Sequence, residues 1–162
     1  MNNEPQHTHL DGTADYIAAL DTLCGLAHSD LFIFEKDFEN LGFNSEARYN
    51  TLRSFLLASP SNRLRLLAHD TRPLAQHCPR LMLLLRQFGH NMHIHQTPKH
   101  LSHLTEPFTV ADEVHYVRRF HFDDPRGILA QHDAEGARIL KSRFEEMWTA
   151  SHQAISASTL GL

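Results

Sequence analysis

Apolar side chains recur at helical spacing in four segments of the chain. In the first segment, Tyr16, Leu20 and Leu23 fall on one face, as expected for a helix that packs against a core. Short polar residues or proline stand where the later segments begin, as helix starts require. Helices are predicted over residues 13–28, from Asn44 or Ser45 to Ser59, from Pro79 to Phe88 and from Asp133 to Trp148.

Short apolar runs between these helices predict strands. Leu31–Phe34 has no polar residue, which is typical of a strand buried on both faces. The sequence around Asp112-Glu113 predicts an antiparallel hairpin, because only these two residues separate two strand-like runs. Strands are predicted at Leu31–Phe34, Arg63–Ala68, Met92–Gln96, Phe108–Ala111 and Val114–Phe122, with a polar turn at Asp123–Gly127.

Strands and helices alternate before the hairpin, and this order predicts right-handed crossover connections. The expected fold class is α/β, with a mixed, mainly parallel sheet and helices on both faces. The chain has 162 residues, enough for one domain with a substantial core. We expect a single domain over residues 13–152, a flexible N-terminus over 1–12 and a flexible tail over 153–162.

Composition limits the location and partners of the protein. The longest apolar runs, such as Leu81–Leu85, are too short to span a bilayer, and the polar N-terminus lacks the features of a secretory signal. We therefore expect a cytoplasmic protein without membrane contact. Seven arginines lie between residues 48 and 86 against Asp70 alone, but the net charge is −4. A nucleic-acid partner thus lacks support from the overall charge, and the arginines are interpreted mainly as solvated faces.

The order of elements, the hairpin with aspartate at its turn and the helix containing Phe144 and Trp148 resemble a single domain of the phospholipase D-like fold. The resemblance covers roughly residues 13–150. The chain also resembles an uncharacterised bacterial branch of that fold, found alone or fused behind acetyltransferase domains. This resemblance implies a homodimer, an acetyltransferase domain or another protein as partner.

Catalytic members of that fold carry His-x-Lys-x-x-x-x-Asp, then Gly-Ser and Asn. Only Asp112 matches, and aligning on it places Thr105 at the histidine position and Pro107 at the lysine position. Arg119-Phe120 then replaces Gly-Ser, and Phe122 replaces the asparagine. Threonine is a poor substitute for the histidine nucleophile and proline carries no charge, so a non-catalytic domain is expected.

Other residues suggest where a ligand binds. In open α/β sheets, ligands bind beyond the carboxyl ends of parallel strands, where His69 and Asp70 follow a predicted strand. Arginines clamp phosphates well, which adds Arg118 and Arg126. The predicted ligand-binding residues are His69, Asp70, Asp112, Arg118 and Arg126. No Gly-rich phosphate loop occurs, and no cofactor is expected.

Two alternatives concern the fourteen histidines of the chain. One is a phosphodiesterase or nuclease whose nucleophile has moved to His95 or His103, with Lys36 or Lys99 as the cation. The other is a metal-binding regulator, because His93 and His95 alternate on a strand and face the same side. Our first hypothesis is a non-catalytic phospholipase D-like module that binds an anionic ligand, a nucleic acid or a protein partner.

Overall fold

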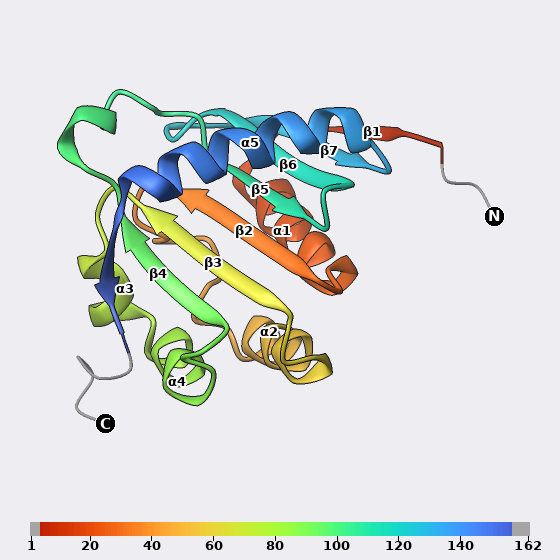
Figure 1. Cartoon of the computed structure of the whole chain (residues 1–162). Coiled ribbons are helices and arrows are strands. Elements are labelled where there is room, and N and C mark those ends of the chain that lie inside the picture. The colour runs from red at the N-terminus through yellow and green to blue at the C-terminus, as the bar shows by residue number, and fades with distance from the viewer. Residues whose placement is uncertain (1–3, 157–162) are drawn as a thin grey trace.

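A computed structural model describes residues 4–156 and contains one sheet with helices on both of its faces (Figure 1). Within these residues the strand order is β1-β7-β6-β5-β2-β3-β4-β8. The strands are β1 Gln6–Leu10, β2 Asp30–Glu35, β3 Arg63–Ala68, β4 Met92–Gln96, β5 Phe108–Ala111, β6 His115–His121, β7 Asp124–Gln131 and β8 His152–Ile155. The helices are α1 Thr13–Leu26, α2 Glu46–Ala58, α3 Arg72–His77, α4 Pro79–Gln87 and α5 Ala134–Ala150, with a 3-10 turn, η1, at Lys99–Leu101.

The mixed α/β class is confirmed, but the expectation of a mainly parallel sheet is wrong. Among the described strands, β2, β3 and β4 pair in parallel, while all other pairings are antiparallel. The sequence pattern missed β1, β7 and β8. Asp124–Gly127, predicted as a turn, opens β7, because polar side chains are tolerated where that strand begins half-exposed.

Both chain ends contribute a strand where flexible segments were predicted. Gln6–Leu10 pairs antiparallel with β7, and His152–Ile155 pairs with β4, so each forms an edge of the sheet. Edge strands expose one side to water and can therefore have polar sequences that look disordered. Residues 157–162 of the predicted tail lie outside the described residues.

The predicted hairpin and the predicted caps are confirmed. Ala111 pairs with His115, so the loop has three residues, 112–114, instead of the predicted two, and Asp112 and Glu113 within it have positive φ, 56° and 57°. Ser45 accepts a hydrogen bond from the Arg48 amide and begins α2, and Asp133 accepts one from the Gly136 amide and begins α5. The sequence pattern did not predict the short helix α3.

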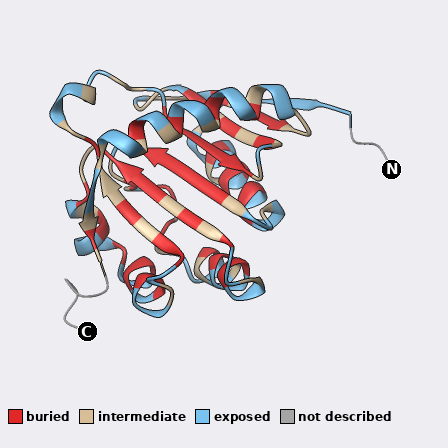
Figure 2. Cartoon of the chain, in the orientation of Figure 1, coloured by how far each residue is buried: buried red, intermediate tan, exposed pale blue. Residues whose placement is uncertain are grey.

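The sheet separates two apolar cores. Helices α1, α2 and α4 cover one face, and the larger core lies between them and the sheet. Helix α5 crosses the other face (Figure 2). There its Leu140, Phe144 and Met147 pack against side chains of β2 and β5 in the second core. This arrangement confirms helices on both faces. Within residues 4–156, no helix is both long and apolar enough to span a membrane.

Candidate functional site

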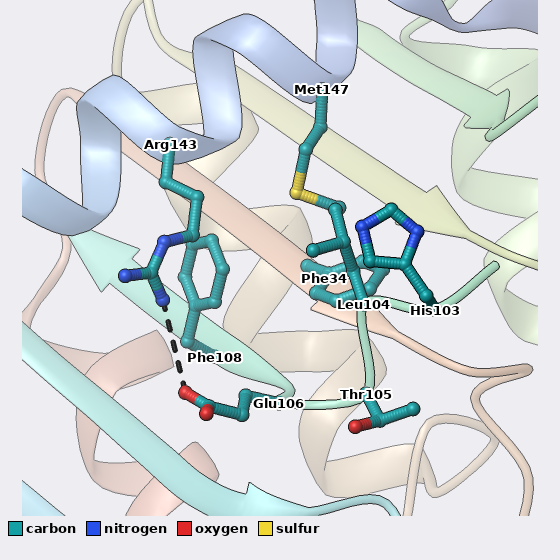
Figure 3. Close-up of a pocket in the computed structure, with 8 residues that line it drawn as sticks. All are labelled: Phe34, His103, Leu104, Thr105, Glu106, Phe108, Arg143 and Met147. Carbon is teal, nitrogen blue, oxygen red and sulfur yellow. Dashed lines mark ion pairs between the residues drawn. The ribbon is translucent and has the colours of Figure 1, made fainter. Parts of the chain in front are cut away.

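A cavity of about 320 Å³ opens where the loop after η1 meets the carboxyl end of β2 and the helix α5. Loop residues 103–106 form one side, Phe34 and Phe108 from β2 and β5 lie at its floor, and Arg143 and Met147 reach in from α5 (Figure 3). Thr105, which the alignment on Asp112 places at the family's histidine position, lines this cavity. The cavity therefore lies where the sequence comparison points.

Three hydrogen bonds hold the loop against the sheet. The Arg119 amide donates to the Pro107 carbonyl over 3.1 Å, and the Phe122 amide donates to the Thr105 carbonyl over 2.9 Å. The third joins the Nε2 atom of His69 to the Leu104 carbonyl at 2.6 Å. The shape of the cavity thus depends on β6 and on the end of β3.

His69 lies beside the cavity with both ring nitrogens occupied. Its Nδ1 atom meets the Thr97 hydroxyl and its Nε2 atom meets the Leu104 carbonyl, while its ring packs edge-on against Phe34 and Phe122. A histidine held in this way has no free nitrogen for a ligand or a substrate proton. Ligand binding by His69 stays a prediction, and the contacts favour a supporting role.

The cavity combines apolar walls with one loose ion pair. Arg143 and Glu106 face each other across it with 3.8 Å between Nη1 and Oε2, and their side chains are 44% and 54% exposed. An ion pair this long and this exposed contributes less than about 1 kcal/mol. An incoming anion can therefore replace Glu106 as the partner of Arg143, while the aromatic floor accepts an apolar body.

Asp112 has a structural role at the other end of β5. Its carboxylate accepts hydrogen bonds from the backbone amides of His28, Ser29 and Asp30 and from the Ser29 hydroxyl. Burial would raise the pKa of Asp112, but these hydrogen bonds outweigh it and hold the pKa below its ordinary range. The carboxylate joins the hairpin turn to the segment that precedes β2.

The other predicted ligand residues do not gather at one place. Asp70 pairs with Arg72 at 2.8 Å, and Arg126 pairs with Asp124 at the same distance. Arg118 lies half-buried in β6, and its Nε atom has no hydrogen-bond partner among the described residues. Ligand binding by Asp70, Arg118 and Arg126 therefore stays a prediction without a shared site.

His95 stacks on Trp148 at the end of β4, with 3.6 Å between ring centroids and 9° between planes. Its Nδ1 atom lies 2.8 Å from the Ser151 hydroxyl. Burial, followed by the nearby positive groups, lowers the pKa of His95 to about 4, so its ring is neutral at pH 7. These contacts are those of a packed aromatic side chain.

The alternative residues do not converge. His103 lines the cavity, but its Nδ1 atom is engaged by the His100 carbonyl at 3.1 Å. Among the described residues, no hydrogen bond or ion pair joins Lys36 or Lys99 to a histidine. His93 and His95 also lack a third metal ligand in the part of the chain that the structure describes.

Sequence reasoning missed the ion pair of Arg143 with Glu106 and a buried network around Glu35. The Glu35 carboxylate accepts a hydrogen bond from the Tyr16 hydroxyl and another, at 3.0 Å, from the Arg119 guanidinium. One signal was available, because Glu35 directly continues an apolar run and so extends a buried strand. The partners of Arg143 and Glu35 lie in distant segments of the chain. The spacing of apolar residues predicts helices and strands, but it does not predict which distant side chains meet.

Solved structures with low sequence identity share this fold. TrmBL2, an archaeal chromatin protein, matches with a TM-score of 0.68 and 11% identity over 92% of this chain and 54% of that chain. The phospholipase D family member Nuc from Salmonella typhimurium matches with 0.67 and 9% over 94% and 100%. The phosphatidylserine synthase of Haemophilus influenzae matches with 0.64 and 12% over 94% and 39%.

These neighbours confirm the phospholipase D-like fold predicted from the sequence, and at such identities they show the fold alone. This chain spans about half the length of TrmBL2. A comparison with curated proteins finds no match. Residues 12–160 match the model of a family described as Domain of unknown function (DUF7931), and the chain belongs to that family.

Proposed function

We propose that this protein is a phospholipase D-like module that binds an anionic ligand in the loop cavity and does not hydrolyse phosphodiesters. The observation that carries the proposal is the lining of the cavity. It contains Arg143, apolar walls and Thr105, but no lysine among its described lining residues, and Thr105 stands where catalytic members of the fold have their histidine. A threonine is a poor nucleophile without a base beside it, so the lining does not reproduce the histidine and lysine of the family motif.

The lining also supports a ligand of a particular shape. Phe34 and Phe108 offer aromatic surface, and Met147 adapts to an apolar body. Arg143 offers a planar guanidinium that carboxylates and phosphates match with two hydrogen bonds. The ligand is therefore an apolar or aromatic group that carries a single phosphate or carboxylate.

Binding can be tested with phenyl phosphate, followed by the amide NMR signals of Thr105 and Glu106. We expect chemical-shift changes that saturate with ligand. The dissociation constant obtained from them should rise about tenfold or more in Arg143→Gln, since a charge-assisted pair contributes roughly 1.5 kcal/mol or more. Arg138→Gln is the matched control, because Arg138 is exposed on the same helix and does not line the cavity. Equal affinity of both variants for phenyl phosphate would show that Arg143 does not bind the ligand.

Catalysis is tested separately, by metal-free hydrolysis of bis(p-nitrophenyl) phosphate. The wild type, His95→Ala and His103→Ala are each expected to show no turnover above buffer. Turnover in the wild type that is lost in either variant would instead support a relocated histidine nucleophile. Circular dichroism of each variant would show that an inactive protein is still folded.

A further inference from the structure

Glu35 is a buried carboxylate at the carboxyl end of β2. It does not line the loop cavity, so the proposed ligand site gives no reason for its burial. Its side chain is 1% exposed and lies between the Tyr16 hydroxyl of α1 and the Arg119 guanidinium of β6. Arg119 is itself only 9% exposed and covers the Tyr16 ring, with 4.4 Å to its centroid. The charge of Arg119 is thus balanced inside the protein by a group that can take up a proton.

The same arginine leads to the loop cavity. Its Nη1 atom donates to the Phe122 carbonyl over 3.1 Å, and the Phe122 amide holds the Thr105 carbonyl. The Phe122 ring also packs edge-on against Phe34 in the cavity floor, with 5.6 Å between centroids. Glu35 and the cavity are therefore connected through Arg119 and Phe122 by direct contacts.

Arg119 also has space into which it can move. A second cavity of about 260 Å³ lies beside it, and Glu35 and Arg119 both line this space. The other charged groups around it are Lys36, Asp37, Glu39 and Asp123. Three of these are carboxylates, so the second cavity can accept the guanidinium when Glu35 no longer balances it.

We propose that Glu35 is a proton-operated switch for the loop cavity, in which its protonation releases Arg119 toward the second cavity and loosens Phe122 and the loop at Thr105. This inference rests on the proposed ligand site for its functional consequence. The carboxylate form holds Arg119 inward and keeps the cavity formed. The neutral form leaves a buried guanidinium without a counter-charge, which is costly unless the side chain moves to water or to another carboxylate.

We expect Glu35 to change its protonation state, and so to operate the switch, near neutral pH. Burial raises the pKa of Glu35 to about 7, although Arg119 and the Tyr16 hydroxyl both favour the charged form and Asp37 opposes it. Ligand affinity should therefore fall as the pH decreases through about 7. His103 also lines the loop cavity, so the functional test separates its contribution from that of Glu35 with the His103→Ala change.

The first test needs no ligand. In wild-type protein, the amide NMR signals of Thr105 and Phe122 should titrate with a common midpoint near pH 7, about where Glu35 does. In Glu35→Gln both signals should stay constant over this range. Signals that do not titrate in the wild type, or that titrate alike in Glu35→Gln, would overturn the switch.

Tyr16→Phe tests the same idea in a milder variant, in case Glu35→Gln does not fold. The change removes a hydroxyl donor that favours the Glu35 carboxylate, so the midpoint at Thr105 and Phe122 should move to higher pH. A midpoint that moves down or does not move would contradict the assignment to Glu35.

The functional step is tested with benzenesulfonate, whose charge does not change over this pH range, in a His103→Ala background. Its dissociation constant should rise about fivefold from about pH 8 to about pH 6, and this rise should vanish when Glu35→Gln is added. If benzenesulfonate and phenyl phosphate fail to bind at either pH, the proposed function fails, while the ligand-free titration still decides the switch. Binding that is independent of pH overturns the control of the cavity by Glu35.

Discussion

Two buried arginines serve the molecule in different ways. Arg48 in α2 is 1% exposed, and its partner Asp21 is 56% exposed, whereas Arg119 and its partner Glu35 are both buried. Arg48 also donates to the backbone carbonyls of Leu41 and Ile17, so each of its three guanidinium nitrogens has a partner. The Nε atom of Arg119 has no partner within the described residues.

The difference shows that burial of an arginine does not by itself identify a functional site. The carboxylate of Asp21 is more than half exposed to water, and backbone carbonyls that do not titrate also hold Arg48, so the Arg48 cluster is a fixed link between α1, α2 and the loop near Gly42. The carboxylate of Glu35 is away from water, so its charge depends on its surroundings. A static clamp and a titratable pair can thus share the same two residue types.

Arg48→Met should have the largest effect. Two backbone carbonyls lose their donor and a fully buried side chain loses its partners, so the free energy of unfolding should fall by about 4 kcal/mol at any pH between about 5 and 9. Urea unfolding would measure it, with Arg53→Met as the control because Arg53 is exposed on the same helix. A loss as small as that of the control would show that Arg48 is not a clamp.

Glu35→Gln should change the pH dependence of stability. The pKa of Glu35 is about 7 in the folded protein against an ordinary value of 4.5, so the folded state holds a proton that the unfolded chain releases. The free energy of unfolding of the wild type therefore decreases as the pH rises through this window, by of the order of 3 kcal/mol. Parallel pH profiles for the two proteins would place the titration elsewhere.

Arg119→Met should destabilise the protein more at high pH than at low pH. Without the guanidinium, the charged form of Glu35 is buried without a counter-charge, which should cost about 2 kcal/mol at pH 8 and less where Glu35 is protonated. Urea unfolding at both pH values checks this, with Arg118→Met as the neighbouring control. An equal loss at the two pH values would mean that Arg119 acts by packing alone.

Asp21→Asn should have the smallest effect. Its side chain is 56% exposed, an asparagine can still accept a hydrogen bond from Arg48, and the two backbone carbonyls that hold Arg48 remain, so the loss should be only about 1 kcal/mol. Thermal and urea unfolding can both resolve it. A loss close to that of Arg48→Met would assign the clamp to the ion pair instead of to the backbone carbonyls.

Sequence reasoning succeeded where a segment is ordered by its own pattern. The helices near Ser45 and Asp133 carry side-chain caps, the helix at Pro79 has a proline at its start, and all three have apolar faces, while the hairpin at Asp112 joins two strands that are close in the chain. It failed at β1, β7 and β8, whose polar sequences become strands only because a neighbouring strand supplies their hydrogen bonds. That neighbour lies far along the chain for β1 and β8, whereas β7 pairs with β6, which directly precedes it.

The candidate site divides in the same way. The motif spacing singled out Thr105, the many histidines drew attention to His103, and both residues line the loop cavity. Arg143 and Glu106 were not found, since 37 positions separate the numbers of these two residues and only the packing of α5 against the loop brings them together.

The sequence by itself therefore determined the local elements, the α/β class and the resemblance to the phospholipase D-like fold, because each depends on residues close together in the chain. The tertiary structure alone decided the strands β1, β7 and β8, the cavity below the loop and the burial of Glu35 with Arg119. Those features depend on long-range pairing and on exclusion of water, and neither is visible in the spacing of residues along a chain.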